Sequence, residues 1–465
     1  MPISTTPALK RFDQNNQPWP DTKYAWFVVI VLFTCSIFSF LDRQILSLLV
    51  EEIKRDLGLS EVQVGWLQGA PFAIFYATMS VPIALAADRL NRKNIIAIGI
   101  SFWSFATAMC GLAGTFSTLF LARIGVGVGE ATLSPSAVSM ISDYFRVDKL
   151  ATALAVFTMG NLMGVGVAVM IGGSVAGWLA GFDTMTLPLI GDIFPWQITF
   201  FIVGLPGLLL AILVYVLREP LRRGVSDPDA HNESIGRSLS RFGSFFMQHR
   251  ATFSTLVGSF TLLVLIAYAN FAWMPTFFRR TFGLDQTEVA WIYGPIVAVF
   301  GTSGALFGGW FSNFLAARGY RDAPYRATLL CTLPLAPCAF MTFVISDTVE
   351  SAVLWFIPWQ FFGAVPAGLA GVAMMTITPN DMRAKINSVY QLFANIIGIT
   401  IGAALVAYIT QEVFADDMMI GSSLAIVNCV GAPLAVLVIW PGMKYFRASR
   451  DQVDAAFSLT GTSAA

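Results

Sequence analysis

The stretch RIGVGVGEATLSPS, residues 123–136, decides the fold because it places two opposite charges, Arg123 and Glu130, inside a very apolar part of the chain. Gly125, Gly127 and Gly129 alternate with isoleucine and valine. A dinucleotide-binding fingerprint would need a strand before the first glycine and a helix after it, and no strand precedes this run. Small residues instead let membrane helices approach closely. We therefore interpret the run as the packing face of a transmembrane helix that carries both charges.

The composition of the whole chain points to the same environment. Hydrophobic residues make up 56% of the 465 residues and charged residues 12%, against about 25% charged in a typical soluble domain. Many apolar runs reach the length of ~20 residues that a helix needs to cross a bilayer core of ~30 Å. The sequence therefore predicts an all-α polytopic membrane protein with twelve transmembrane helices. The predicted spans are 24–49, 61–87, 94–114, 117–141, 150–174, 196–217, 251–279, 286–316, 326–346, 351–376, 385–412 and 420–446.

The spans form two groups of six around a polar linker. We expect a cytoplasmic tail at 1–23, an N-terminal half at 24–217, a cytoplasmic linker at 218–250, a C-terminal half at 251–446 and a cytoplasmic tail at 447–465. The first tail has no apolar segment followed by a cleavage site, so it does not resemble a signal peptide. With both termini inside, 22 of the 28 lysines and arginines lie on the cytoplasmic side, as the positive-inside rule expects. The prediction is a multi-pass protein of the cell (inner) membrane with cytoplasmic termini.

Four charged residues lie well inside the predicted spans, away from their ends: Asp42, Arg43, Arg123 and Glu130. Each charge at the bilayer centre costs at least about 2.5–3.5 kcal/mol, so these groups need a polar cavity, partners or a proton. Spans one and four run in opposite directions, which puts Asp42 and Arg123 at similar depth and permits a pair between them. Glu130 lies on the same helix face as Arg123, about 10 Å deeper and near the midplane. Arg43 should point about 100° away from Asp42 and reach toward the outer interface.

These charges suggest proton chemistry. Desolvation near the midplane favours the neutral form of a carboxyl, and a nearby arginine favours the charged form. Glu130 is therefore a candidate proton carrier, and Asp42 a group that exchanges between Arg123 and a proton. The alternative is a buried ion pair that only holds helices together. We favour the functional interpretation because intramembrane ionisable residues mark substrate and ion pathways.

Other polar and aromatic residues are candidates to line the same cavity, although each alone is more often a packing residue. They are Gln68, Tyr76, Asn161, Tyr268, Asn270, Trp273, Trp359, Tyr390 and Asn395. Asn270 and Trp273 lie one turn apart before Pro275, which should break span seven locally, so this turn is the stronger candidate for a pocket or gate. The predicted substrate-binding residues are Arg123, Glu130, Tyr76, Asn270, Trp273, Tyr268 and Tyr390.

Two groups of six spans with Asp88-Arg-Leu-Asn-Arg-Lys93 between spans two and three resemble the major facilitator superfamily. The family pattern begins with glycine four residues before the aspartate, where this chain has Ala84. The resemblance covers essentially the whole chain and implies a transporter that works by alternating access. It also implies a cytoplasmic gate against the second half. The residues of that expected gate are Asp88, Arg89 and Arg92, with Asp143 or Arg146 as charge partners.

Within the superfamily, several phrases resemble the Spinster family of lysolipid and sphingolipid transporters. They are Leu41-Asp42-Arg43, the Asp88–Lys93 run, Gly127-Val-Gly-Glu-Ala131 and Arg218-Glu-Pro220. The resemblance implies that Asp42, Arg43, Arg123 and Glu130 couple proton movement to the conformational cycle. The G-x-x-x-G-P motif associated with antiporters is incomplete, since Val165 stands where proline would be. The direction of transport relative to protons therefore stays open.

The sequence thus predicts a proton-coupled secondary transporter of a lipid-like amphipathic substrate, such as a lysophospholipid or a sphingosine-phosphate-like molecule. The alternative on the same fold is a transporter of small organic anions. A non-transporting receptor or a membrane enzyme is the third hypothesis, and no nucleophile–base pair or ATP-binding motif supports an enzyme. All five cysteines lie in apolar spans and both histidines in the linker, so no cofactor or metal site is predicted. The expected partners are the substrate, protons and the bilayer, without nucleic acid, and the expected state is a monomer.

Overall fold

The computed structural model describes residues 19–182, 184–187, 191–223, 235–379 and 382–459. Within these residues, twelve helical segments are long and apolar enough to cross a membrane. This confirms the predicted all-α polytopic fold. Most ends fall within a few residues of the predicted ones, but the last helix continues to Leu459.

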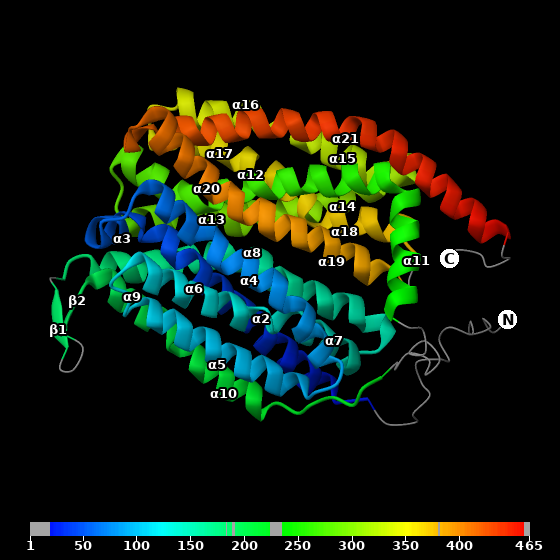
Figure 1. Ribbon diagram of the computed structural model, residues 1–465, viewed down its shortest axis with the longest axis horizontal. Coiled ribbons are helices and arrows are strands. Elements are labelled where there is room, and N and C mark those ends of the chain that lie inside the picture. The colour runs from blue at the N-terminus through cyan, green and yellow to red at the C-terminus, as the bar shows by residue number, and fades with distance from the viewer. Residues whose placement is uncertain (1–18, 183, 188–190, 224–234, 380–381, 460–465) are drawn as a thin grey trace.

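The first six spans form one bundle, drawn from blue to green in the lower part of Figure 1. Spans one to three are single helices, and spans four and six each consist of two helices in line. The elements are α2 (Thr22–Leu48), α4 (Glu61–Ala87), α5 (Arg92–Cys110), α6 (Phe116–Glu130), α7 (Leu133–Tyr144), α8 (Val147–Leu179), α9 (Pro195–Gly204) and α10 (Pro206–Val216).

The last six spans form a second bundle, which lies beside the first (Figure 1). Three of them contain wider π-helical segments: η3 and η4 lie in one span each, and η5 and η6 lie in the same span. The elements are α12 (Arg250–Phe282), α13 (Gln286–Ile296), η3 (Val297–Gly301), α14 (Thr302–Ala317), α15 (Ala323–Thr332), α16 (Leu335–Phe340), η4 (Met341–Ile345), α17 (Val349–Ala364), α18 (Pro366–Ile377), α19 (Arg383–Phe393), η5 (Ala394–Ile399), α20 (Thr400–Tyr408), η6 (Ile409–Phe414), η7 (Asp417–Met419) and α21 (Ile420–Leu459). The two bundles meet where α4 packs on α20 and α8 packs on α13.

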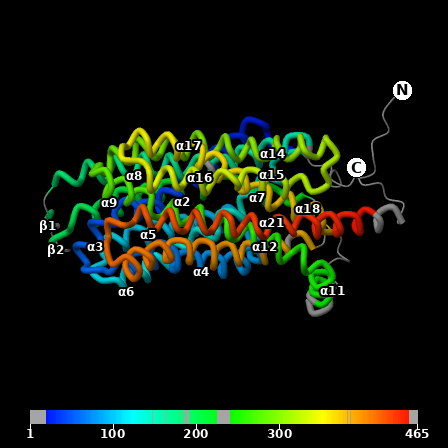
Figure 2. Tube along the Cα trace, turned by 90° about the horizontal axis from the view of Figure 1, so that it is seen from above, coloured from blue at the N-terminus to red at the C-terminus, as the bar shows by residue number. Residues whose placement is uncertain are grey.

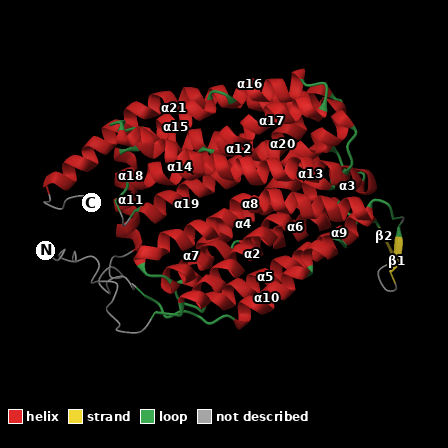
Figure 3. Cartoon of the chain, turned by 180° about the vertical axis from the view of Figure 1, so that it is seen from behind, coloured by secondary structure: helices red, strands yellow, loops and turns green. Residues whose placement is uncertain are grey.

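The two ends of the molecule differ. One end carries α3 (Val50–Leu57) and a small antiparallel hairpin of β1 (Met185–Leu187) and β2 (Gly191–Ile193), in which Thr186 faces Asp192. The other end carries α11 (Ile235–Gln248), which lies across the ends of the long helices, and both described ends of the chain (Figures 1 and 3). Seen from above, α11 projects beyond the bundle (Figure 2). We call these the α3 end and the α11 end.

Close packing explains the glycine run of residues 125–129. A Cβ atom on Gly127 of α6 would lie 2.7 Å from the carbonyl oxygen of Phe72 in α4, and one on Gly129 would lie 2.7 Å from the backbone nitrogen of Trp103 in α5. Only glycine permits these approaches. The expected break at Pro275 is wrong, because α12 runs unbroken from Arg250 to Phe282. A transmembrane helix tolerates a proline when neighbouring helices support the freed backbone groups.

Candidate functional site

The charged residues of α2 and α6 meet in the interior of the first bundle. Arg123 is 2% exposed, and its Nη1 donates a hydrogen bond of 2.8 Å to the backbone carbonyl of Asp42. The two residues therefore lie at the same depth, but the arginine contacts the backbone of Asp42 rather than its carboxylate. The Asp42 carboxyl is also 2% exposed, and its Oδ1 has no hydrogen-bond partner among the described residues. Trp103 and Thr107 of α5 lie beside it.

Deeper in the bundle, Glu130 holds Arg43. Its Oε2 accepts hydrogen bonds from Arg43 Nε at 2.6 Å and from Ser39 Oγ at 2.5 Å. The expectation that Arg43 reaches toward the outer interface is wrong. Side chains on a helix tilt toward its N-terminus, so the long arginine turns back along α2 toward Ser39, one turn earlier, and there meets Glu130 of α6. A buried carboxylate without a partner would be costly, and this ion pair removes that cost.

Aromatic rings surround the Arg43 guanidinium on several sides. Its central carbon lies 4.3 Å from the ring centre of Phe72, 4.9 Å from that of Phe40 and 5.1 Å from that of Tyr76. Stacking on ring faces stabilises a desolvated cation. Arg43 is therefore held by one carboxylate and three rings at the centre of the site.

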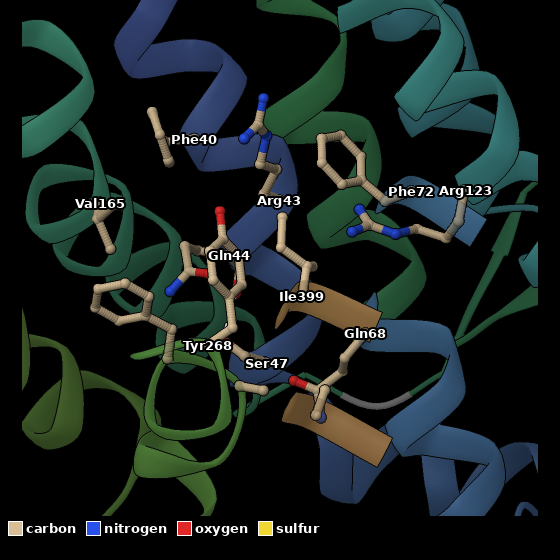
Figure 4. Close-up of a pocket in the computed structure, with 13 residues that line it drawn as sticks. Phe40, Arg43, Gln44, Ser47, Gln68, Phe72, Arg123, Val165, Tyr268 and Ile399 are labelled. Carbon is tan, nitrogen blue, oxygen red and sulfur yellow. Dashed lines mark hydrogen bonds between the residues drawn. The ribbon is translucent and has the colours of Figure 1, made fainter. Parts of the chain in front are cut away.

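Arg43 and Phe40 together separate two cavities. The first cavity, of about 50 Å³, lies between the two bundles and is lined by Phe40, Arg43, Gln44, Ser47, Gln68, Phe72, Arg123, Val165, Tyr268, Phe271, Ala272, Ile399 and Ala403. Figure 4 draws these residues: Arg43 lies between Phe40 and Phe72 in this view, and the side chain of Arg123 points inward toward Phe72. The second cavity, of about 110 Å³, is lined by Ser36, Ser39, Phe40, Arg43, Tyr76, Glu130, Leu133, Ser134, Phe157 and Asn161. Arg43 thus forms a wall between an arginine-containing cavity and the cavity of Glu130.

The predicted substrate-binding residues divide into two groups. Arg123 and Tyr268 line the first cavity, Glu130 and Tyr76 line the second, and Tyr390 lies near Tyr268. Asn270 and Trp273 line neither cavity, which corrects the prediction for that turn.

Both residues of that turn are buried packing residues of the second bundle. Asn270 Nδ2 donates to Asn428 Oδ1 at 3.2 Å, and Trp273 Nε1 donates to the carbonyl of Ala403 at 2.8 Å. Trp359 Nε1 donates to the same Asn428 oxygen at 3.0 Å. Their polar atoms are used within the bundle, so they are not available to a substrate.

Sequence reasoning missed several lining residues, among them Phe40, Gln44 and Ser47 of α2 and Phe72 of α4. A signal for them existed. Positions 40, 43, 44 and 47 recur at the spacing of one helix face, as do 68, 72 and 76. Following that face outward from Arg43 would have found them.

The comparisons with known proteins agree with this architecture. The family model described as Major Facilitator Superfamily matches residues 32–403. The chain belongs to the major facilitator superfamily. It is 24% identical over 426 residues to the "Probable L-galactonate transporter" of Escherichia coli (strain K12), which covers 89% of this chain and 88% of the relative. It is 25% identical over 411 residues to Protein spinster homolog 1 of Xenopus laevis, covering 84% and 74% of the two chains.

Among solved structures, the chain resembles a bacterial homolog of the human lysosomal transporter Spinster in an inward-facing, unoccupied conformation. The TM-score is 0.73 and the identity 25%, with 93% of this chain and 98% of the other covered. The resemblance to the Spinster family expected from the sequence is therefore confirmed. The protein is a major facilitator transporter with a Spinster-like fold.

The Asp88–Lys93 loop of this transporter forms its contacts within the first bundle. Arg92 is 1% exposed, and its guanidinium binds Asp143 at 2.5 Å and Glu219 at 2.7 Å. Asp88 and Arg89 are exposed, and exposed Arg146 pairs only loosely with Asp148, at 3.9 Å. In this conformation Arg92 joins α5 to α7 and to the segment after α10, and the expected gate against the second half stays a prediction.

At the α3 end, by contrast, ion pairs join the two halves. Arg280 of α12 binds Glu51 at 2.8 Å and Glu61 at 2.7 Å, and donates to the carbonyl of Asp417 at 2.9 Å. The neighbouring Arg279 holds Glu52 through both carboxylate oxygens, at 2.8 and 3.1 Å.

Lys54 completes this network, since its ammonium contacts Glu61 and, across the halves, Asp417. Burial alone would lower the pKa of Lys54, but its hydrogen bonds to Asp417 and Glu61 raise it. The network closes the α3 end.

Proposed function

We propose that this transporter moves a small organic anion together with a proton by alternating access. The observation that carries the proposal is the first cavity. It is small, it lies between the two halves, and it contains the guanidinium groups of Arg43 and Arg123. A guanidinium is the side chain best suited to hold a carboxylate or phosphate. A cavity of about 50 Å³ has room for only one or two water molecules, so even a small substrate requires it to widen.

Proton coupling follows from the pair of Arg43 and Glu130. Protonation of Glu130 would remove its charge and release Arg43 from the wall between the cavities. A released Arg43 can then bind the anion beside Arg123. Loss of the proton would draw Arg43 back to Glu130 and weaken the anion site. Asp42, with an unpartnered Oδ1 beside Arg123, is the second candidate to carry a proton.

The orientation is part of the proposal. The positive-inside rule places the α11 end, with the described chain ends, in the cytoplasm and the α3 end outside. The cross-half ion pairs at the α3 end then correspond to a closed outer side, so that access is from the cytoplasm. We further propose that the protein is a monomer of the cell membrane, composed of the two six-helix halves and the linker.

The lipid-like substrate favoured by the sequence is the second candidate. Two observations favour it: the structural likeness to the Spinster homolog, and the apolar walls that Phe40, Phe72, Val165 and Phe271 give the first cavity. Two further curated relatives are named "Probable galactarate/D-glucarate transporter" and "Hexuronate transporter", both from Bacillus subtilis (strain 168), which supports the small anion.

Uptake into proteoliposomes separates the two candidates. The purified protein is tested with radiolabelled galactonate and with lysophosphatidylglycerol, with and without an inward proton gradient. The proposal expects gradient-dependent galactonate uptake that Arg123→Gln reduces at least tenfold. Transport of the lysolipid alone would refute the small-anion proposal and support the lipid.

A further inference from the structure

We propose that Gln44 and Gln68 are a specificity-determining pair that reads hydroxyl groups next to the anionic group of the substrate. This inference rests on the anion transport proposed above and narrows its substrate class. Gln44 lies on α2 directly after Arg43, and Gln68 lies on α4 one turn before Phe72. Both line the first cavity together with Arg123, and Figure 4 shows both in the same view of it.

The amide atoms of these two side chains lack protein partners. Nε2 and Oε1 of Gln68, and Nε2 of Gln44, are shielded from solvent and form no hydrogen bond with the described residues. The Nε of Arg123 in the same cavity has none either. A shielded polar atom without a hydrogen bond costs about 1–3 kcal/mol. Four such atoms around one cavity indicate a ligand that supplies the missing bonds.

The amide nitrogens of three buried asparagines do find partners, although Oδ1 of Asn94 and Oε1 of Gln360 form no hydrogen bond with the described residues. Asn270 Nδ2 donates to its own helix at 2.8 Å, and so do Asn428 Nδ2 at 2.8 Å and Asn395 Nδ2 at 2.6 Å. The fold therefore satisfies shielded amides at these positions with its own carbonyl groups. Gln44 and Gln68 line the cavity, and there the amide atoms named above have no such partner.

The chemistry of an amide identifies the group it reads. An amide offers one acceptor and two donors, and a hydroxyl group can both accept and donate, whereas an alkyl chain can do neither. The arginines take the anionic group, so the amides of α2 and α4 face the adjacent part of the molecule.

The opposite wall is mostly apolar: Phe271 and Ala272 of α12, Ile399 of η5 and Ala403 of α20 line it, and the ring of Tyr268 adds the one hydroxyl group that the second half contributes to the lining. Amide groups are thus offered by the first half, while the second half packs mainly apolar side chains against the carbon chain. The substrate class is an anion with hydroxyl groups within a few bonds of its charge. A site built this way rejects an analogue that lacks the hydroxyls, because its own polar groups would stay unpaired.

Calorimetric titration of the full-length protein in detergent tests the pair with two acids of equal charge and carbon number, gluconate and hexanoate. The parent should bind gluconate at least tenfold more tightly. Gln68→Leu and Gln44→Leu should each reduce the gluconate affinity about tenfold and leave hexanoate binding unchanged or tighter. Gln248→Leu, an exposed position at the end of α11, is the matched control and should retain the parent ratio.

Equal affinity of the parent for the two acids, or an unchanged ratio in both cavity variants, overturns the inference. The failure of the proposed function is distinct. If Arg123→Gln leaves the binding of both acids unchanged, the anion site itself is wrong. A third outcome is that neither acid binds, while lysophosphatidylglycerol binds to the parent and more weakly to Gln68→Leu. The glutamine pair would then recognise the hydroxyl groups of a lipid headgroup, which supports the pair and refutes the small-anion function.

Discussion

Replacing Arg280 with glutamine should open the α3 end. Arg280 is the hub of the cross-half network: it binds Glu51 and Glu61 of the first half, and its side chain is 7% exposed. Glu61 is 1% exposed and would keep only Lys54 as a partner. Because these contacts join the halves, they stabilise only conformations in which that end is closed.

The size of the shift can be worked from these contacts. Breaking a buried ion pair by removing one partner costs about 3–5 kcal/mol. Lys54 still neutralises Glu61, and the pair of Arg279 with Glu52 persists, so we expect about 2 kcal/mol against the closed state. That is roughly a 30-fold change in the equilibrium between closed and open conformations. Arg280→Lys keeps the charge but loses the fork that binds two carboxylates, and should give a smaller shift.

Distances between spin labels at Arg55 and Glu412 would report the change. Both positions are exposed at the α3 end, on opposite halves, and their side chains bond only to their sequence neighbours Asp56 and Gln411. Arg280→Gln should add a population at longer distance. Arg321→Gln removes an exposed ion pair within the second half at the α11 end and should leave the distances unchanged. An Arg280→Gln protein that is folded, by its thermal melt, and keeps the parent distances would refute the reasoning.

Three further predictions concern single residues. Glu130→Gln should abolish the pH dependence of anion uptake in proteoliposomes, because the amide cannot exchange a proton. Glu130→Asp should retain part of this pH dependence. A parent-like pH profile in Glu130→Gln would exclude Glu130 as the coupling carboxyl. Gly127→Leu should lower the thermal stability by several degrees, since its Cβ alone would lie 2.7 Å from the Phe72 carbonyl, and Gly309→Leu, where a Cβ meets no atom within 4 Å, is the control. Burial lowers the pKa of His249, so the folded state favours the neutral ring. This contribution to stability is present above about pH 6.5 and is lost as the pH falls. The melting temperature of the parent should therefore fall more between pH 7 and pH 5 than that of His249→Gln, and parallel curves would contradict this.

The sequence alone determined the parts of this protein that depend on local chemistry. Hydropathy over a window of about twenty residues located the spans, because each membrane helix must satisfy its own backbone within the bilayer. The cost of intramembrane charge selected Asp42, Arg43, Arg123 and Glu130. Helix periodicity put Arg123 and Glu130 on one face. The glycine run was recognised as a packing surface, which the approach of Gly127 to Phe72 bears out.

Only the tertiary structure decided which groups meet. Arg43 turns back to Glu130 because a long side chain can choose among partners that sequence spacing does not reveal. Asn270 and Trp273 form their side-chain hydrogen bonds within the second half. Arg92 is satisfied within the first half, while Arg280 joins the two halves. Such choices depend on how helices distant in sequence pack and on which end of the transporter is closed, and neither is encoded in any short stretch of the chain.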